Sequence, residues 1–244
     1  MSKGSAGAPS FAAADLEVMS DAENYVRWIF SDLVAPHLGP RVLEIGSGIG
    51  TFSTRIVAHQ TVKQLTCVEI DLSCSATARE ALAVAQVRKP VEHIVGDYLG
   101  TPLPKGDYDT ALLINVLEHL QDDRAAVAKA HSELRQDGTL VIFVPAFGLL
   151  MSGLDRRLGH YRRYTTGSLR KLLEGAGFTV TALRYYNLTG FFGWLWRFRI
   201  RGRTQQSPGM VRFFDRVILP VQLLVERAVH LPVGQSVYAV AKKR

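Results

Sequence analysis

The sequence has 244 residues, 47% of them hydrophobic, and a formal net charge of +7. This composition excludes a disordered or fibrous chain and is enough for one enclosed core. No run approaches the roughly eighteen apolar residues of a membrane span, and the small, polar first residues lack the apolar centre of a signal peptide. The two cysteines, Cys67 and Cys74, match no metal-binding spacing, so we expect free thiols, no metal ion and a cytoplasmic protein.

Charge is divided unevenly along the chain. Residues 1–150 contain 12 Lys and Arg against 18 Asp and Glu, a net charge of −6, whereas residues 151–244 contain 17 against 4, a net charge of +13. The basic part predicts either a solvated surface or contact with something anionic, such as a phosphorylated or carboxylated substrate or a membrane surface. No nucleic-acid-binding module is visible, so nucleic acid is not an expected partner.

The chain begins with a segment, residues 1–20, that we expect to be a disordered or helical extension. Residues 21–244 are expected to form a single domain. A helix is predicted around residues 24–28, where Tyr25 either closes over a ligand or packs into the core.

Residues 41–51, Arg-Val-Leu-Glu-Ile-Gly-Ser-Gly-Ile-Gly-Thr, predict a buried strand followed by a tight turn and a helix. Glycines at alternate positions permit backbone angles and a close approach to a ligand that side chains would prevent. A dinucleotide fingerprint needs its third glycine at position 51, which is Thr51. This departure counts against a dinucleotide-dependent reductase.

Three further strands are predicted at residues 64–70, 91–95 and 109–115. The first ends at Glu69, where a carboxylate can accept both hydrogen bonds of a ribose diol. The second leads into Gly-Asp97-Tyr98, and the third into Asn115-Val-Leu-Glu-His119. A helix near residues 122–135 and a fifth strand at residues 139–144 follow. Strands at residues 178–186 and 236–241, with a helix at residues 166–175 before them, complete the pattern.

In its order and spacing, the segment from residue 41 to residue 145 resembles class I S-adenosylmethionine-dependent methyltransferases. The resemblance implies an α/β, Rossmann-like fold: a seven-stranded, mostly parallel sheet with helices on both faces and the last strand antiparallel beside the sixth. It implies S-adenosyl-L-methionine as cofactor. The implied cofactor-binding residues are Glu44, Gly46, Gly48, Gly50, Glu69, Ile70, Asp97, Tyr98, Asn115 and Tyr25.

The segment that follows the fifth strand narrows the resemblance to one branch of this family. Asp155 and the run Gly-His160-Tyr161-Arg-Arg163-Tyr164 form a D-x3-G-H-x-R-R-Y loop. This loop is similar to that of a branch often found beside, or fused to, glycosyltransferases of polyprenyl-phosphate type. The loop leaves the ligand-binding edge of such a sheet. We therefore expect substrate contacts from Tyr161, Arg163, Tyr164 and Trp194.

An insertion at residues 187–234 separates the sixth and seventh strands and mixes bulky apolar residues with arginines. It predicts a helical lid over the site, or a surface that contacts a membrane or a lipid-like substrate. Oligomeric state stays open.

The expected reaction is methyl transfer to a small-molecule or lipid-like acceptor, with oxygen favoured as the accepting atom. A hydroxyl acceptor requires removal of a proton, and His160 and His119 are the candidate catalytic residues. Carbon or nitrogen methylation of a natural-product intermediate, or cofactor binding without turnover, are the alternatives. The run Asn115-Val-Leu-Glu118 lacks the Asn/Asp-Pro-Pro-Tyr/Phe pattern of amide and nucleobase amine methylators, which disfavours those substrates.

Overall fold

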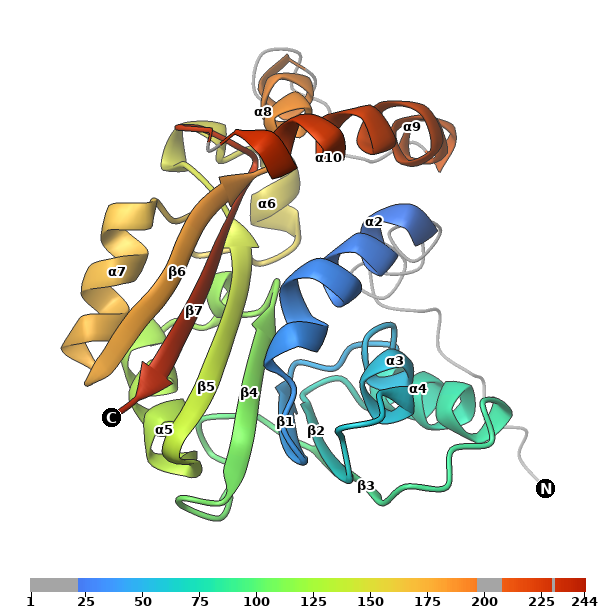
Figure 1. The fold of residues 1–244 in the computed structure, drawn as a ribbon, viewed down its shortest axis with the longest axis vertical. Helices are drawn as coiled ribbons and strands as arrows, with labels where there is room; N and C mark the ends of the chain where they lie inside the picture. Colours follow the sequence, from blue (N-terminus) through green and yellow to red (C-terminus); the bar gives the residue numbers. More distant parts are fainter. Residues whose placement is uncertain (1–21, 197–207, 230) are drawn as a thin grey trace.

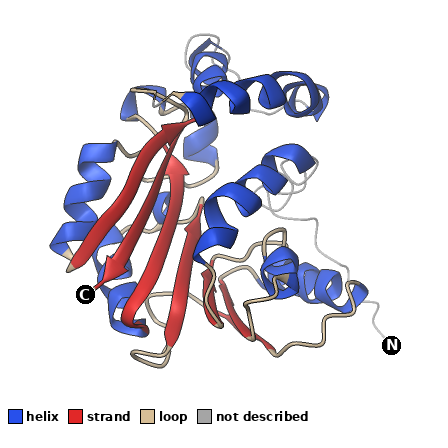
Figure 2. Ribbon diagram, viewed as in Figure 1, coloured by secondary structure: helices blue, strands red, loops and turns tan. Residues whose placement is uncertain are grey.

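The computed structural model describes residues 22–196, 208–229 and 231–244. A seven-stranded sheet lies at its centre, with helices packed on both faces (Figures 1 and 2). The strands are β1 (Arg41–Ile45), β2 (Gln64–Glu69), β3 (Val91–Val95), β4 (Tyr108–Ile114), β5 (Leu134–Pro145), β6 (Phe178–Tyr186) and β7 (Ser236–Lys243). The predicted extension at residues 1–20 lies outside the described residues.

The sheet has the order β3-β2-β1-β4-β5-β7-β6. Strands β1 to β5 pair in parallel, and β7 pairs antiparallel with both β5 and β6. This confirms the predicted fold class, including the reversed last strand beside the sixth. The chain order reverses between β1 and β4, the position at which open α/β sheets bind their ligands.

Helices fill the connections. They are α2 (Glu23–Trp28), which continues into η1 (Ile29–Val34) and η2 (Ala35–His37), then α3 (Ser53–Ala58), α4 (Leu72–Val84), η3 (Leu117–His119), α5 (Asp123–Glu133), η4 (Gly148–Leu150), α6 (Gly153–Arg157), α7 (Thr166–Gly175), α8 (Leu188–Trp194), α9 (Pro208–Phe213), η6 (Phe214–Ile218) and α10 (Leu219–Ala228). The last four lie between β6 and β7, which confirms the predicted helical insertion. In the described part of the chain, no helix combines the length and apolar character needed to cross a membrane.

Alternating side chains of the central strands build a core on each face of the sheet. Leu113 and Ile142 pack on one face with residues of α5 and α7, while their neighbours Leu112 and Phe143 pack on the other with residues of α2, η1 and α3. Each such fully buried side chain contributes about 1.5–3 kcal/mol relative to an exposed one. Continuous burial along β4 and β5 therefore explains why their sequences are apolar runs and not alternating ones.

The helix predicted near residues 122–135 is confirmed as α5, which ends at Glu133. Two other local predictions are wrong. The fifth strand begins at Leu134 instead of at residue 139, because Leu134 pairs with Tyr108 of β4. The segment at residues 147–166, expected as a loop, contains η4 and α6. A capping box begins α6, in which the Ser152 and Asp155 side chains each accept the other residue's backbone N–H.

Candidate active site

The turn after β1 depends on two glycines that make close contacts. Gly46 has φ +69°, and a Cβ there would lie 2.4 Å from Val116 Cγ2. Gly50 has φ +84°, and a Cβ there would lie 2.9 Å from the Cα of Ala78 in α4. The first contact joins the turn after β1 to the segment after β4, and the second lets α4 pack against the turn. Both glycines are therefore required by geometry.

Gly46→Ala is expected to lower the free energy of unfolding by about 2 kcal/mol or more. A left-handed backbone costs a residue with a Cβ about 1–2 kcal/mol, and the clash with Val116 adds to this. Gly106 is a matched control, because it has φ +66° with nothing within 4 Å of a built Cβ. Urea denaturation of both variants separates the backbone cost from the steric cost. Equal losses would show that Val116 moves aside freely.

Glu69 holds this turn to the end of β2. It is buried, and its Oε2 accepts the Gly48 N–H at 2.7 Å while its Oε1 accepts the Asp71 N–H at 2.9 Å. A carboxylate has about four acceptor positions, so two remain for the ribose hydroxyls assigned to it from the sequence. The structure thus gives Glu69 a role in shaping the turn as well.

The neighbouring cofactor residues divide into exposed and buried side chains. Ile70 is 71% exposed at the carboxyl end of β2, and Asp97 is exposed after β3. An apolar side chain in the open beside a carboxylate fits an adenine ring, whose face would cover Ile70 while its amino group meets Asp97. Tyr98 is buried instead, and its hydroxyl donates to Glu133 of α5 at 2.7 Å. The Tyr98 side chain is therefore part of the core and is not available for a ligand contact.

Glu44 lies beneath the glycine turn and not at its surface. Its Oε2 accepts the Ser53 hydroxyl at 2.6 Å, and the Cys67 thiol lies 3.6 Å away. Burial raises the pKa of Glu44 to about 7. Asn115, after β4, is exposed with φ +54°, and its N–H donates to the Phe143 carbonyl. Asn115 is thus exposed where a ligand could reach it, whereas Glu44 is buried beneath the glycine turn and supports it through Ser53.

Tyr25 of α2 is partly buried against the carboxyl end of the sheet. Its ring lies edge-on to Phe143 at 6.5 Å between centroids. Burial raises the pKa of Tyr25 to about 12, although hydrogen bonds to Ser236 and Asn187 oppose this shift. The side chain is therefore held in the core, and a contact with the cofactor would use its ring edge.

The two predicted catalytic histidines meet in space. His119 ends η3 and His160 follows α6, and their rings lie edge to face with centroids 4.5 Å apart. The backbone joins the same segments, because the Tyr161 N–H donates to the Glu118 carbonyl at 2.9 Å. The structure thus brings together the segments after β4 and β5, and Val116 connects this cluster to the glycine turn.

Asp155 organises the cluster from within the protein. It is fully buried, and its Oδ1 lies 2.9 Å from His160 Nδ1 and 2.7 Å from an Arg163 guanidinium nitrogen. Its Oδ2 accepts the Ser152 hydroxyl at 2.6 Å. Burial alone would raise the pKa of Asp155, but the His160, Arg163 and Ser152 contacts together lower it to about 2. A permanent carboxylate therefore fixes the His160 ring.

Glu118 and His119 complete the cluster, and burial shifts the pKa of each. The Glu118 side chain is buried, which raises its pKa to about 7. Burial, together with the nearby His160, lowers the pKa of His119 to about 4. His119 is therefore a neutral imidazole at physiological pH, and its ring is hydrogen-bonded to the backbone of Leu158.

The four predicted substrate residues do not share one environment. Tyr161 is 57% exposed. Arg163 is buried, with its guanidinium 4.8 Å from the centre of the Trp194 ring. Tyr164 is also buried, and its hydroxyl donates to Asp123 Oδ2 at 2.9 Å. The Tyr164 side chain is thus structural, whereas Tyr161 is exposed next to His160 and Trp194 packs on Arg163; a substrate contact by either stays a prediction.

The insertion is tied to α2 by one buried carboxylate. Asp215 of η6 accepts the Asn24 N–H at 3.1 Å and the Tyr25 N–H at 2.8 Å, and it is nearly inaccessible to solvent. These amides lie in the first turn of α2, whose preceding residue Ala22 supplies no side-chain cap. Asp215 therefore caps a helix that lies 190 residues away in sequence.

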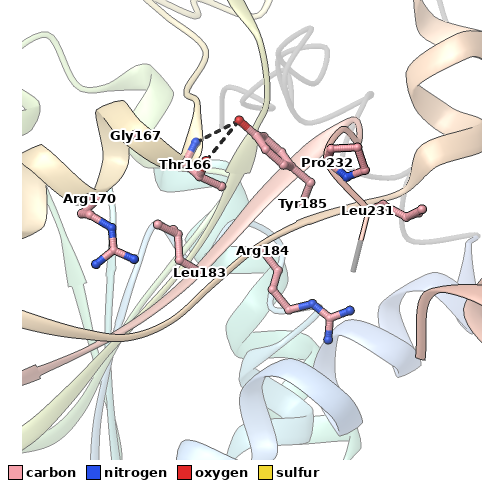
Figure 3. A pocket seen from close by; sticks show the side chains of 8 residues that line it. All are labelled: Thr166, Gly167, Arg170, Leu183, Arg184, Tyr185, Leu231 and Pro232. Carbon is pink, nitrogen blue, oxygen red and sulfur yellow. Dashed lines mark hydrogen bonds between the residues drawn. The ribbon is translucent and has the colours of Figure 1, made fainter. Parts of the chain in front are cut away.

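A shallow pocket of about 470 Å³ lies elsewhere, at the β6 edge of the sheet (Figure 3). Its lining includes Arg170, Arg184 and Tyr185, and the Tyr185 hydroxyl accepts the Thr166 N–H at 3.1 Å. None of the predicted site residues lines it. We therefore place the candidate site at the carboxyl ends of β1, β2, β4 and β5, and not in this pocket.

A family model described as a methyltransferase domain matches residues 19–183. The chain belongs to this methyltransferase family. A probable S-adenosylmethionine-dependent methyltransferase of Mycobacterium tuberculosis is 30% identical over 172 residues, which cover 67% of this chain and 59% of that protein. This methyltransferase chain thus spans about three fifths of the length of that relative.

Solved structures show the same fold at low identity. A chain of the Haloferax volcanii complex between the Trm112 methyltransferase activator and a methyltransferase matches with a TM-score of 0.65 and 13% identity, covering 95% of this chain and 93% of that one. Phosphoethanolamine N-methyltransferase 2 of Haemonchus contortus, solved with S-adenosyl-L-methionine, matches with a TM-score of 0.59 and 15% identity, covering 91% of this methyltransferase and 57% of that chain.

Three functional side chains were not assigned roles from the sequence. In the sequence, Asp155 belongs to the loop pattern, Glu118 precedes His119, and Asp215 is an acidic residue within a basic, apolar insertion. An isolated acidic residue in such surroundings is the available signal, because burial of an unpaired carboxylate is costly and requires a partner. Its partner cannot be identified without the fold.

Proposed function

We propose that this chain is an S-adenosylmethionine-dependent methyltransferase that transfers a methyl group to a hydroxyl of a small-molecule or lipid-like acceptor. The observation that carries the proposal is the Glu118–His119–His160 cluster. One residue separates Glu118 from Val116, which contacts the glycine turn. An ordinary hydroxyl must lose its proton during methylation, and this cluster offers the groups that could assist. Methylation at carbon can proceed without them.

The cofactor residues present fit S-adenosyl-L-methionine. The glycine turn lies at the carboxyl end of β1 with left-handed backbone angles at Gly46 and Gly50, Glu69 retains acceptor positions, and Ile70 and Asp97 are exposed where an adenine would lie. When bound, this cofactor supplies an electrophilic methyl group on a sulfonium. The protein orients the acceptor and excludes water. The basic charge of residues 151–244 favours an acceptor that carries a phosphate or a carboxylate.

The loop from Asp155 to Tyr164 supports the narrower branch found beside polyprenyl-phosphate-type glycosyltransferases. Every residue of its pattern has a structural partner here, from the Asp155–Arg163 ion pair to the Tyr164–Asp123 hydrogen bond. A cofactor-binding module without turnover remains the second candidate, because the glycine turn alone would suffice for it.

His160→Asn is expected to lower turnover by about a hundredfold or more while leaving cofactor affinity unchanged, because His160 lies after β5 and outside the glycine turn. Calorimetry with S-adenosylhomocysteine measures the affinity, and NAD serves as the negative control ligand. Methyl transfer is measured by mass spectrometry on extracted small molecules and lipids offered as acceptors. Alkali-stable methyl ethers would identify a hydroxyl as the acceptor, whereas alkali-labile methyl esters would identify a carboxylate and contradict the hydroxyl assignment. Methylated amines would contradict the oxygen assignment, and normal turnover would remove His160 from the reaction.

Glu69→Ala is expected to weaken S-adenosylhomocysteine binding by about 1.5–3 kcal/mol, the range for hydrogen bonds to a charged group. The same variant also loses the Gly48 and Asp71 contacts. Glu69→Gln preserves two acceptor positions and should lose less affinity. Calorimetry on both variants, with circular dichroism to verify the fold, measures the difference. Unchanged affinity in Glu69→Ala would exclude the ribose role.

A further inference from the structure

Three side chains at the centre of the site are arranged as metal ligands. Glu118, His119 and His160 each offer one ligand atom, and these atoms all lie within 4.8 Å of one another. They come from two segments, η3 after β4 and the turn after α6, so the sequence does not suggest the grouping. No metal ion is expected from the cysteines or from any local spacing.

The Glu118 side chain is the strongest indication of a missing partner. It is 1% exposed, and among the described residues its Oε2 has no hydrogen-bond donor. A buried carboxylate oxygen without a donor is costly, and a bound cation is one of the few ways to compensate it. The nearby Arg163 is already engaged by Asp155.

Both histidines are oriented by second hydrogen bonds, as metal-binding histidines are. His160 Nδ1 lies 2.9 Å from Asp155 Oδ1, which leaves Nε2 free. The His119 ring is held by the backbone of Leu158. A carboxylate or carbonyl behind each imidazole fixes its tautomer and makes the other nitrogen a better ligand. The Ser152 and Arg163 contacts in turn keep Asp155 in place.

We propose that Glu118, His119 and His160 bind one Zn²⁺ ion and leave a coordination position open for the acceptor hydroxyl. Two imidazoles and one carboxylate are a ligand set of catalytic zinc sites. This inference rests on the proposed function, because the ion would lower the pKa of the hydroxyl. The O–H bond breaks and its proton passes to solvent. The oxygen electron pair then forms the O–CH₃ bond, while the S–CH₃ electron pair stays on sulfur.

The test uses the full chain after dialysis against a chelator. Calorimetry with Zn²⁺ should show one site with a dissociation constant of about 1 µM or lower, and titration with Co²⁺ should produce visible absorption bands of a nitrogen- and oxygen-ligated ion. Glu118→Gln and His160→Asn should each weaken Zn²⁺ binding at least about a hundredfold. Asp155→Asn, which acts through His160, should weaken it about 10–100-fold.

His93→Asn on β3 is the control, because this histidine lies outside the cluster. Zn²⁺ binding that is absent, or that is equally strong in Glu118→Gln, would overturn the site. Methyl transfer and S-adenosylhomocysteine binding that persist without metal would overturn the metal while sparing the proposed function. Zn²⁺ binding without methyl transfer in the metal-loaded protein would overturn the proposed function and leave the metal site in place.

A second inference comes from the insertion, in which α9, η6 and α10 form one continuous helix over residues 208–228 that exposes apolar side chains and buries polar ones. Phe213, Val217, Val221 and Leu224 follow helical spacing and are between 53% and 68% exposed. The opposite side of the same helix is buried although it carries polar and charged side chains. These are Asp215, Gln222 and Glu226.

The buried polar side chains hold the helix in this orientation. Asp215 caps α2, Gln222 Oε1 accepts the Thr189 N–H at 3.2 Å, and Glu226 Oε1 accepts the Leu188 N–H at 2.9 Å. Rotation of the helix to bury its apolar face would break all of these contacts. The apolar face is therefore fixed outward, and its exposure is a property of the fold.

We infer that this face docks on an anionic membrane surface. Arg212, Arg216 and Arg227 are exposed along the same helix, and the part of the chain from residue 151 onward has a net charge of +13. An apolar stripe flanked by arginines matches the acyl boundary and the charged headgroups. The helix lies beyond the carboxyl ends of the parallel strands, over the edge that carries the candidate site (Figure 1).

Sedimentation with vesicles of phosphatidylcholine and 30% phosphatidylserine, roughly the anionic content that gives a negative cytoplasmic leaflet, tests this inference. The protein should pellet at low salt and be released by about 0.5 M salt. The variant Val221→Glu/Leu224→Glu should remain in the supernatant, whereas Val84→Glu on α4, which is even more exposed but lies elsewhere, should pellet normally. Failure of the native chain to pellet would overturn the inference. So would a dimer in light scattering that the double variant abolishes, because the face would then bind a second copy.

Discussion

Asp155→Ala is expected to lower the free energy of unfolding by about 3–5 kcal/mol, the cost of removing one partner of a buried ion pair. The Arg163 side chain is 1% exposed and would lose its carboxylate. The Ser152 N–H and hydroxyl would lose their acceptor, so the capping box of α6 would keep only the bond from the residue-155 N–H to the Ser152 hydroxyl. Because domains of this kind have only about 5–15 kcal/mol of stability, this single change removes a large share of it.

Glu174→Ala provides the control, because the Arg170–Glu174 pair is about half exposed on both sides. Its loss should change stability by less than about 0.5 kcal/mol. Urea denaturation of both variants in buffer that contains a chelator measures the two effects without any contribution from bound metal. A loss of under about 1 kcal/mol in Asp155→Ala would show that water reaches Arg163 and replaces the carboxylate.

Glu44→Gln is expected to stabilise the protein at pH 8 and to have little effect at pH 4. The pKa of Glu44 is raised from 4.5 to about 7 by burial, so the folded state binds this proton more tightly than the unfolded state. The stabilisation from the bound proton is complete below pH 4.5 and is lost as the pH rises to about 7. Each pH unit in this window changes stability by about 1.4 kcal/mol, which amounts to about 3 kcal/mol in total.

Glutamine keeps an acceptor for the Ser53 hydroxyl and removes the charge. The difference in unfolding free energy between the variant and the native chain should therefore grow from pH 5 to pH 8. Glu118 has a raised pKa as well and titrates in both proteins, so the difference cancels its contribution. A difference that stays constant with pH would mean that the buried Glu44 charge is compensated in the folded state.

The positions of the strands could be predicted because local sequence determines them, whereas the arrangement of the sheet was implied by the family resemblance. The run from Arg41 to Ile45 ends in glycines, and β3, β6 and α7 have the bounds that their patterns predict. Burial on both faces makes such strands continuously apolar, and turn residues interrupt the runs. Strand signals of this kind do not depend on contacts that are distant in sequence.

The candidate site could be predicted only in part, because its contacts join distant segments. The turn glycines, Glu69 and the two histidines follow from position relative to strand ends. The contact between His160 and Asp155 does not follow from the sequence. Asp155 lies in α6, a helix that the sequence did not indicate, and this helix brings it to His160. Tyr98 and Tyr164 look like ligand contacts in the sequence, yet each hydroxyl bonds to an acid of α5 in the structure. Whether a side chain points toward a ligand or into the core depends on tertiary packing, which the sequence pattern does not reveal.

The Asp215 cap also has a consequence for the order in which the chain folds. The first turn of α2 takes its carboxylate from a residue about 190 positions later, so this helix, although made early during synthesis, cannot finish until the insertion has emerged and packed. Until then Trp28 and Ile29 lack their full set of neighbours. Contacts of such long sequence separation form slowly. The apolar side chains at the beginning of the chain are therefore among the last to be completely packed, although they are the first to be synthesised.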